Sequence, residues 1–398
     1  MTAAEFDRID VGTLRRAGSV KWSMYPEAIG AFVAEMDFGT APPVTAALHA
    51  AVEAAAFGYL PAGAAEQMSA ACAAWSRDRY GWAVDPVDVR PVADVVAALT
   101  LAIEHFSAPG TPVVLPTPAY MPFVSVPPRL GREVIEVPLT GEHRYDLDAL
   151  AAAFEAGGDL LILCNPHNPV GRVLTAEEML AVADVVDRYG GRVFSDEIHA
   201  PLVFGDARHV PYASLSPVTA AHTLTATSAS KAWNLPGLKC AQVVLSSDAD
   251  RDTWTRIGPL AEHGAATLGV IANTAAYESG GPWLADVLSY LDGNRRLLGT
   301  LVADLLPGVV YTPPEGTYLG WLDFRPTGPA DPAPYFLEKA GVAMTDGALC
   351  GEAGRGFGRF NFALPRPVLR EAVERIAAAM PWCPRGTKGR DRGRRSPS

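Results

Sequence analysis

Short apolar runs alternate with helix-like segments from residue 89 onward, and this alternation continues for about 200 residues. The clearest apolar runs are TPVVLPTPAY (111–120), REVIEVPL (132–139) and DLLILCNPHNPVG (159–171). Strands that alternate with helices in this way form a mostly parallel sheet with helices on both faces. The sequence therefore predicts an α/β fold. Ligands of such folds bind at the carboxyl ends of the strands, and polar residues follow the predicted strands here.

Start and stop signals place several helices. The Ala-rich run at 44–57 has helical periodicity and is broken by Gly-Tyr-Leu-Pro at 58–61, after which a second helix is expected up to residue 81. Thr175 stands three residues before Glu178, which is a capping-box pattern at the start of another helix. A helix at about 145–158 is expected to begin near Asp146 or Asp148.

A second pattern follows the alternating region and predicts a smaller α+β unit. Its elements are a long helix at about 282–306, a strand pair around Gly316, a helix near 334–340, the run GRFNFALP and a last helix at 367–380. The strand-like run AFVAEMDFG at 31–39 is expected to complete this unit. We therefore predict a large domain at 44–283, a small domain formed by 1–43 and 284–384, and a basic, disordered tail at 385–398.

Composition limits the class of protein. A chain of 398 residues is too long for one compact core, and 49% hydrophobic against 19% charged residues indicates a globular protein. No apolar run approaches the ~20 residues that cross a bilayer, and the start MTAAEFDRIDVG does not resemble a signal peptide, so a cytoplasmic protein without a membrane partner is expected. The net charge of −11 argues against a nucleic-acid surface.

The five cysteines are dispersed and form no CxxC pair; they are Cys72, Cys164, Cys240, Cys350 and Cys383. An odd, scattered set is typical of reduced thiols, so neither a disulfide framework nor a metal site is expected.

The stretch TLTATSASKAWNLPGLK at 223–239 contains the clearest candidate for a catalytic side chain, Lys231. Most lysines are exposed and only solvate the surface. A lysine packed among Ala, Ser and Trp is different, because desolvation lowers the pKa of its amine and makes it a nucleophile. That chemistry suits an amine that forms a Schiff base with an aldehyde cofactor.

Two side chains that follow predicted strands fit such a cofactor. Asp196, in FSDEIHAP, would keep a heteroaromatic nitrogen protonated and so strengthen an electron sink. Taken alone, an aspartate at this position is more often a helix cap or a member of an ion pair. Asn168 lies in CNPHNPVG, where two Asn-Pro steps restrict the backbone. Its amide is placed to donate to a phenolate oxygen, or to make an ordinary Asx turn.

Other residues fit a phosphate, a flat ring or a carboxylate. The helix start in VADVV (92–96) offers backbone N–H groups to a phosphate, and Ser228, Ser230 and Tyr59 offer hydroxyl groups. Tyr120 is placed to stack on a ring or to join the core. Arg359 is placed to bind a substrate carboxylate or to lie at the surface.

The order of these motifs resembles a known family. N-P-x-N-P-x-G, S-D-E-I-H, S-x-S-K-x-W-N-x-P-G, E-G-T-Y-x-x-W and R-F-N-x-A-x-P-R follow one another as in the fold-type I enzymes that use pyridoxal 5′-phosphate (PLP). SVKW (19–22), VAEMDF (33–38), DEIHA (196–200) and SKAWNLPGLK (230–239) resemble the cystathionine β-lyase branch, the MalY/PatB family of C–S lyases. The resemblance covers residues 5 to 380.

This resemblance implies a mostly parallel, seven-stranded type of large domain, a homodimer with shared active sites, and a role for each candidate. Lys231 would be the Schiff-base lysine, Asp196 the partner of the pyridine nitrogen, Asn168 the partner of the ring hydroxyl and Tyr120 the stacking ring. The phosphate would be held by the Asp94 and Val95 amides, Ser228, Ser230 and, from the second subunit, Tyr59. Arg359 would hold the carboxylate of an amino-acid substrate.

Four positions separate this chain from parts of the family. His199 stands where aminotransferases more often have a tyrosine, which favours the lyase branch, and Lys239 replaces an arginine that often binds the phosphate. The family usually has Asp where this chain has Glu35, and often Gly or Thr where it has Ala93. The change at Glu35 is expected to affect the substrate side.

The implied activity is a C–S β-lyase that cleaves cysteine thioethers such as L-cystathionine to a thiol, pyruvate and ammonia. An aminotransferase needs nearly the same residues. A third candidate is a lyase of secondary metabolism that acts on a bulky S-conjugated cysteine, with or without a coupled decarboxylation. A non-catalytic protein on the same fold is a fourth, because a fold alone does not fix a function.

Overall fold

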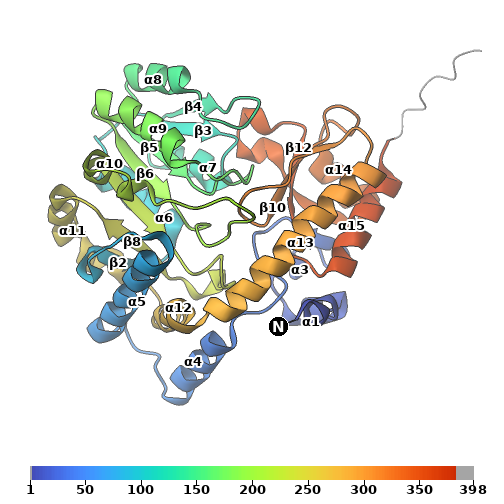
Figure 1. The fold of residues 1–398 in the computed structure, drawn as a ribbon, viewed down its shortest axis with the longest axis horizontal. Coiled ribbons are helices and arrows are strands. Elements are labelled where there is room, and N and C mark those ends of the chain that lie inside the picture. The colour runs from blue at the N-terminus through green and yellow to red at the C-terminus, as the bar shows by residue number, and fades with distance from the viewer. Residues whose placement is uncertain (1, 382–398) are drawn as a thin grey trace, which may run out of the picture.

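The computed structural model describes residues 2–381, so the predicted basic tail at 385–398 lies outside the described residues. Two β-sheets of different size organise this part of the chain (Figure 1). The larger one lies among the helices of the first two thirds of the chain, and the smaller one lies beside α13, α14 and α15.

The larger sheet has seven strands in the order β2-β8-β7-β6-β5-β3-β4. All neighbours from β4 to β7 are parallel, whereas β8 runs antiparallel to both β7 and β2. The strands are β2 (Val89–Val92), β3 (Val113–Thr117), β4 (Val134–Pro138), β5 (Leu160–Cys164), β6 (Arg192–Asp196), β7 (Thr223–Thr227) and β8 (Ala241–Leu245). The predicted α/β fold with a mostly parallel sheet is confirmed.

Both faces of this sheet are buried, because successive residues of a strand enter opposite cores. Leu160 and Ile162 pack into a cluster with α6 and α7, whereas Leu161 and Leu163 pack into another with α8 and α9. This explains why the strands read as continuous apolar runs. The helices of this region are α4 (Pro42–Glu53), α5 (Ala62–Tyr80), α6 (Val95–His105), α7 (Met121–Arg129), α8 (Leu147–Glu155), α9 (Ala176–Arg188), α10 (Pro217–His222), α11 (Asp248–Ala261) and α12 (Thr267–Ser279).

The smaller sheet has five strands in the order β1-β11-β12-β10-β9. They are β1 (Ile29–Ala31), β9 (Val310–Tyr311), β10 (Leu319–Asp323), β11 (Val342–Asp346) and β12 (Phe357–Asn361). The N-terminal strand β1 pairs in parallel with β11, so the N-terminal segment contributes a strand to this sheet. The accompanying helices are α1 (Ala3–Asp7), α2 (Val11–Ala17), α3 (Val20–Ser23), α13 (Gly281–Leu305), α14 (Pro332–Ala340) and α15 (Arg366–Ala379).

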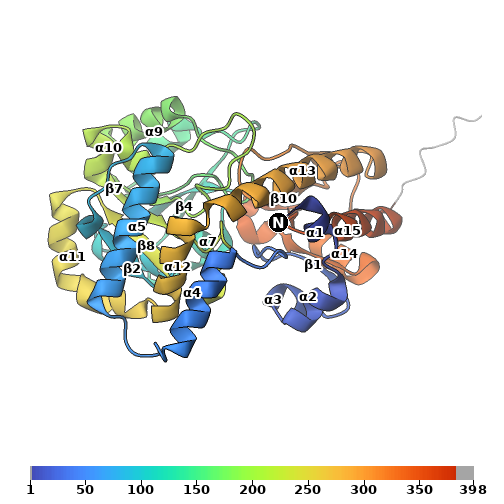
Figure 2. The same ribbon diagram turned by 60° about the horizontal axis from the view of Figure 1, so that its bottom comes forward.

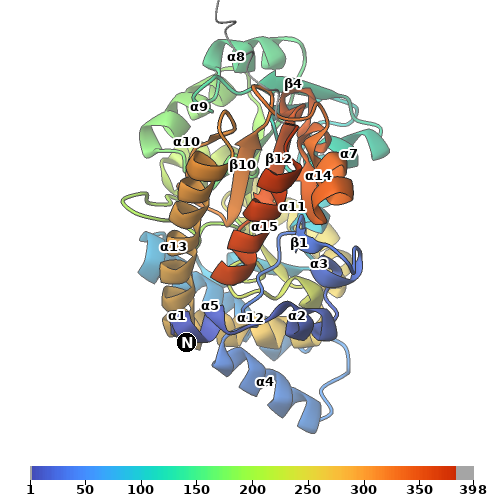
Figure 3. The same cartoon turned by 90° about the vertical axis from the view of Figure 1, so that its right-hand side faces the viewer.

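Helix α13 joins the two regions. It begins next to α12 and runs to α15, as Figures 2 and 3 show. The predicted domain boundary at residue 283 falls near its start. The boundaries at 43 and 283 stay a prediction.

The strand expected at 31–39 is wrong. Strand β1 ends at Ala31, and the peptide groups beyond it pair with side chains instead of with a neighbouring strand. The Asn361 amide donates to the carbonyls of Val33 and Glu35 at 2.6 and 2.7 Å, and the Asn234 amide donates to the Met36 carbonyl at 2.9 Å. The apolar residues of this segment are therefore buried without forming a strand.

Other expectations have mixed outcomes. The capping box of Thr175 and Glu178 is present at the start of α9, and Asp146 caps α8 through the Ala149 amide. Helix α7 and strand β11 were not predicted. Three prolines in this segment argue against a helix. Pro122 lies at the first turn of α7, where its missing N–H has no intrahelical partner to lose, whereas Pro127 and Pro128 lie inside the helix near its end.

Among residues 2–381, the structure contains no helix that combines the length and the apolar character needed to cross a membrane.

The close approach of strand β1 to helix α3 gives a testable prediction. A Cβ atom added at Gly30 would lie 2.0 Å from the Lys21 carbonyl oxygen, which is backbone and has little freedom to move. We expect Gly30→Ala to lower the free energy of unfolding by about 1–3 kcal/mol in urea titrations. Gly281→Ala is the matched control, because nothing lies within 4 Å of its added Cβ. Equal stability of the two variants would contradict this packing.

Candidate active site

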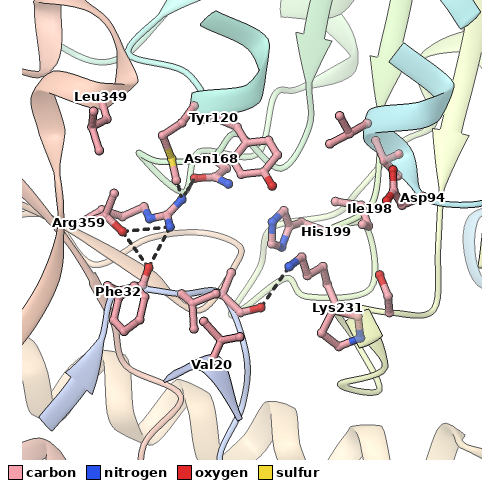
Figure 4. A pocket seen from close by; sticks show the side chains of 18 of the residues that line it. Val20, Phe32, Asp94, Tyr120, Asn168, Ile198, His199, Lys231, Leu349 and Arg359 are labelled. Carbon is pink, nitrogen blue, oxygen red and sulfur yellow. Dashed lines mark hydrogen bonds between the residues drawn. The ribbon is translucent and has the colours of Figure 1, made fainter. Parts of the chain in front are cut away.

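A cavity of about 780 Å³ lies where the carboxyl ends of the parallel strands face the smaller sheet. Most of the predicted site residues line it, and Figure 4 shows how several of them point into it. The lining includes Asp94, Val95, Tyr120, Asn168, Asp196, His199, Ser230, Lys231, Lys239 and Arg359. Ser228 and Tyr59 are the two predicted residues that do not line it.

Lys231 follows strand β7 and reaches into the cavity from a turn that is fixed by its neighbour Trp233. The Trp233 ring is fully buried and packs edge-on against Trp75 at 5.0 Å. Burial, followed by the positive charge of Arg359, lowers the pKa of Lys231 to about 8. A substantial share of this amine is therefore neutral near pH 7–8, which is the state of a nucleophile or a base.

Asp196 ends strand β6 and is buried, with 3% of its surface exposed. Its Oδ1 accepts one hydrogen bond from the Ile198 N–H at 3.0 Å, and its Oδ2 lies 3.9 Å from the Cys164 thiol. Burial raises the pKa of Asp196 to about 7. A carboxylate with so few donors is stabilised by a cation, such as a protonated ring nitrogen beside it.

Asn168 and Arg359 are held together across the two sheets. Arg359 Nη1 donates to Asn168 Oδ1 at 3.0 Å, so the oxygen of the amide is fixed by the guanidinium. The nitrogen of the amide is then turned toward Tyr120 and the cavity (Figure 4). A donor in this position suits an anionic ring oxygen.

Arg359 lies on strand β12 and is only 2% exposed. Its hydrogen-bond acceptors among the described residues are neutral: the Asn168 amide, the Phe32 carbonyl at 2.9 Å, the Thr345 hydroxyl at 3.1 Å and the Met121 thioether at 3.7 Å. Its Nε has no partner there. A buried charge without a counter-ion is costly, so this arginine fits an anionic group of a ligand.

His199 is buried beside these two cations. Burial, then the charges of Lys231 and Arg359, lower the pKa of His199 well below its usual value. Its ring is therefore a neutral imidazole, and its Nδ1 has no partner among the described residues. Its ring centre lies 6.1 Å from that of Tyr318.

The opposite end of the cavity offers groups for a phosphate. Helix α6 begins here, with Asp94 as its N-cap, and its first N–H groups favour an anion. The Asp94 carboxylate is occupied, since it accepts from the Ala97 N–H and from Lys239 Nζ, each at 2.8 Å. Ser230 lines the cavity at this end. Ser228 does not, because its hydroxyl donates to the Cys240 carbonyl at 2.7 Å and accepts from the Ser230 N–H.

Tyr59 does not line the cavity of its own chain. It follows helix α4 and is 88% exposed, and its ring contacts His263 with centres 5.5 Å apart.

Two backbone carbonyls of the N-terminal segment belong to the site and were not predicted. The Ala34 carbonyl accepts from Lys231 Nζ at 3.0 Å and from the Tyr318 hydroxyl at 2.8 Å. The Phe32 carbonyl accepts from Arg359 Nη2. A backbone carbonyl leaves no mark in a side-chain motif, so its role in a site cannot be recognised from the sequence. Only the SVKW and VAEMDF runs on either side could have indicated that this segment belongs to the site.

A buried ion pair fixes this segment. Lys21 and Asp37 lie 3.1 Å apart, with side chains 0% and 2% exposed. Lys21 Nζ also donates to the Glu35 and Ala363 carbonyls, both at 3.2 Å, and Trp22 Nε1 donates to Asp37 Oδ1 at 2.8 Å. Through these contacts the pair holds the Phe32 and Ala34 carbonyls in place for Arg359 and Lys231.

These groups fit PLP. Asp196 is an underpartnered buried carboxylate for a ring nitrogen, the Asn168 amide is a donor for a ring oxygen, and Lys231 is an amine for the aldehyde carbon. The start of α6 and Ser230 suit the phosphate.

Comparisons with known proteins also indicate a PLP-dependent enzyme. The sequence model of the family described as aminotransferase class I and II matches residues 33–376. A cystathionine β-lyase of Corynebacterium glutamicum is 38% identical over 372 residues, which cover 92% of this chain and 98% of that protein. The cystathionine β-lyase PatB of Bacillus subtilis is 32% identical, with 91% and 96% covered. A Corynebacterium diphtheriae structure described as a PLP-dependent β-cystathionase has a TM-score of 0.89 and 42% identity, with 93% and 97% covered.

The chain therefore belongs to the class I and II aminotransferase family of PLP-dependent enzymes. Within this family it belongs to the group that contains the cystathionine β-lyases, as the resemblance implied, and its cofactor is PLP.

The pKa of Lys231 predicts how the cofactor attaches. The ammonium form does not attack an aldehyde and the free amine does, so the rate of attachment rises with pH and levels off above the pKa. Because that pKa is lowered to about 8, we expect a midpoint near pH 8 when the visible absorbance of cofactor-free protein is followed after PLP is added. Lys231→Ala should give no such change. A midpoint above pH 10, as for an exposed lysine, would contradict the described environment.

Proposed function

We propose that the chain is a C–S β-lyase that converts a cysteine thioether, such as L-cystathionine, and water into a thiol, pyruvate and ammonia. The observation that carries the proposal is that Arg359 shares one cavity with the amine of Lys231, whose pKa is about 8. Arg359 is buried and has no acidic partner among residues 2–381. The cystathionine β-lyases among the relatives support it.

Arg359 would bind the α-carboxylate of the substrate and so fix its orientation. The Asn168 amide and the Phe32 carbonyl already hold the guanidinium, so little side-chain freedom is lost when the substrate binds. The neutral amine of Lys231, hydrogen-bonded to the Ala34 carbonyl, would then accept the proton from the substrate Cα.

When bound, PLP supplies the electron sink that makes this proton removable and lets the thiolate leave from Cβ. Asp196 would hold its ring nitrogen protonated, Asn168 would donate to its ring oxygen, and Tyr120 would stack on its ring. The amides of Asp94 and Val95, with Ser230, would hold its phosphate. Lys239 is paired with Asp94, so it would act there mainly by offsetting that carboxylate. The predicted contact of Ser228 requires its hydroxyl to leave the Cys240 carbonyl.

We also propose a homodimer in which Tyr59 of each chain completes the other active site. Three apolar side chains at the end of α4 and after it are unusually exposed: Val52 by 52%, Phe57 by 66% and Tyr59 by 88%. Helix α4 stands at the rim of the molecule, as Figures 1 and 3 show. Exposed apolar groups that gather in this way are typical of interaction surfaces.

A cytoplasmic location is proposed on the state of the cysteines. The described ones are free and buried, as expected in a reducing compartment; they are Cys72, Cys164, Cys240 and Cys350.

The lyase and the aminotransferase differ in their need for a keto acid. Purified holoenzyme is incubated with L-cystathionine, and pyruvate and free thiol are measured with and without an added keto acid. The lyase produces both products without it. Turnover that depends on an added keto acid would establish an aminotransferase instead.

The shared Ala34 carbonyl gives a second prediction. Tyr318→Phe removes one hydrogen bond to this carbonyl, so the segment that orients Lys231 is held less firmly. A hydrogen bond of about 0.5–1.5 kcal/mol corresponds to a roughly 2- to 10-fold lower kcat/KM in steady-state kinetics.

Tyr335→Phe is the matched control, because the Tyr335 hydroxyl donates to the Ala379 carbonyl at 2.9 Å, outside the cavity. Its stability should fall by a similar amount while kcat/KM stays at the wild-type value. Equal kinetics of the two variants would show that Tyr318 does not act on Lys231.

A further inference from the structure

Part of the cavity wall is formed by large apolar side chains, and we call this part the outer pocket. Six side chains form it: Val20, Met24, Tyr25, Pro334, Leu337 and Leu349. They come from α3 and the turn after it, from α14, and from the turn at Gly347–Cys350. Figure 4 shows Leu349 on the Arg359 side of the cavity, across from Asp94 at the phosphate end.

The outer pocket is apolar and open. Val20, Met24 and Leu349 are 48%, 56% and 58% exposed, which is unusual for large apolar side chains grouped around one cavity. The cavity of about 780 Å³ lies in the upper part of the ~300–1,000 Å³ range of ligand pockets. It therefore has room for a substituent beside the cofactor and the amino-acid part of a substrate.

Charged groups are scarce in this part of the cavity. Of the charged residues that line the cavity within the described chain, Asp94, Asp196, Lys231 and Lys239 lie toward the cofactor. Near the outer pocket the one further charged lining residue of the described chain is Asp346, whose Oδ1 accepts a hydrogen bond from the Ala348 N–H at 3.0 Å. Apart from Arg359, which the substrate α-carboxylate would use, the described part of the chain places no cation at the outer pocket.

The scarcity of charged groups in the outer pocket affects which S-substituent of a thioether can bind there. The distal part of L-cystathionine carries an ammonium and a carboxylate, and a charged group that enters an apolar pocket without a partner loses hydration that nothing replaces. An alkyl or aryl group instead gains from leaving water.

We infer that the outer pocket binds the S-substituent of the substrate and selects cysteines with a neutral, apolar substituent over thioethers that end in a second amino acid. This inference rests on the proposed lyase function and narrows its substrate class.

The test compares S-benzyl-L-cysteine with L-cystathionine on the wild-type holoenzyme, with pyruvate release as the measure of kcat/KM. We expect at least a tenfold preference for the benzyl substrate, the order of selectivity that an apolar pocket provides. An equal or higher kcat/KM for cystathionine overturns the inference and leaves the lyase function standing. Absence of pyruvate from both substrates overturns the lyase function and the inference with it.

A charge-insertion variant tests the pocket itself. Leu349→Arg places a cation at an exposed position of the outer pocket, where it would attract a distal carboxylate and disfavour a benzyl ring. We expect the benzyl-to-cystathionine ratio of kcat/KM to fall about tenfold. Val218→Arg is the matched control, since Val218 is 43% exposed on α10 and does not line the cavity. An unchanged ratio in Leu349→Arg would show that the substituent does not lie there.

Discussion

The hydrogen bond from Lys231 to the Ala34 carbonyl joins the two halves of the molecule inside the candidate active site. Lys231 follows strand β7 of the seven-stranded sheet, whereas Ala34 follows strand β1 of the five-stranded one. The carbonyl is in place because the buried Lys21–Asp37 pair and the Asn361 amide fix the backbone on either side of it. Breaking such a buried pair is strongly destabilising, so the segment has one well-defined position.

The charges of the site are only partly compensated within the described chain, and that imbalance explains its affinity for a ligand. Arg359 is buried among neutral acceptors, Asp196 has few donors, and the amine of Lys231 loses part of its charge. Each of these states costs free energy in the protein alone. The carboxylate of a substrate would relieve the first, and the protonated ring nitrogen and the aldehyde carbon of PLP would relieve the other two. The free energy that these states cost the protein alone is then recovered when cofactor and substrate bind.

Local patterns were sufficient for much of the fold and for part of the site. The parallel sheet, the Thr175 cap and the positions of Asp196 and Lys231 at strand ends follow from runs of a few residues. The contact of Ala34 with Lys231 was not predictable, because it links residues 197 positions apart through a backbone carbonyl. The segment after Ala31 has the apolar pattern of a strand, yet its backbone carbonyls accept hydrogen bonds from distant side chains instead of from a neighbouring strand. The orientation of the Ser228 hydroxyl also depends on a neighbouring strand that no local pattern specifies.

The central claim is that Lys231 is the amine that holds PLP. Reduction of the holoenzyme with borohydride fixes the cofactor to its lysine, and peptide mass mapping then identifies that lysine. The account predicts the added mass on the peptide that contains Lys231. Modification of Lys239 or Lys21 with Lys231 unmodified would contradict it.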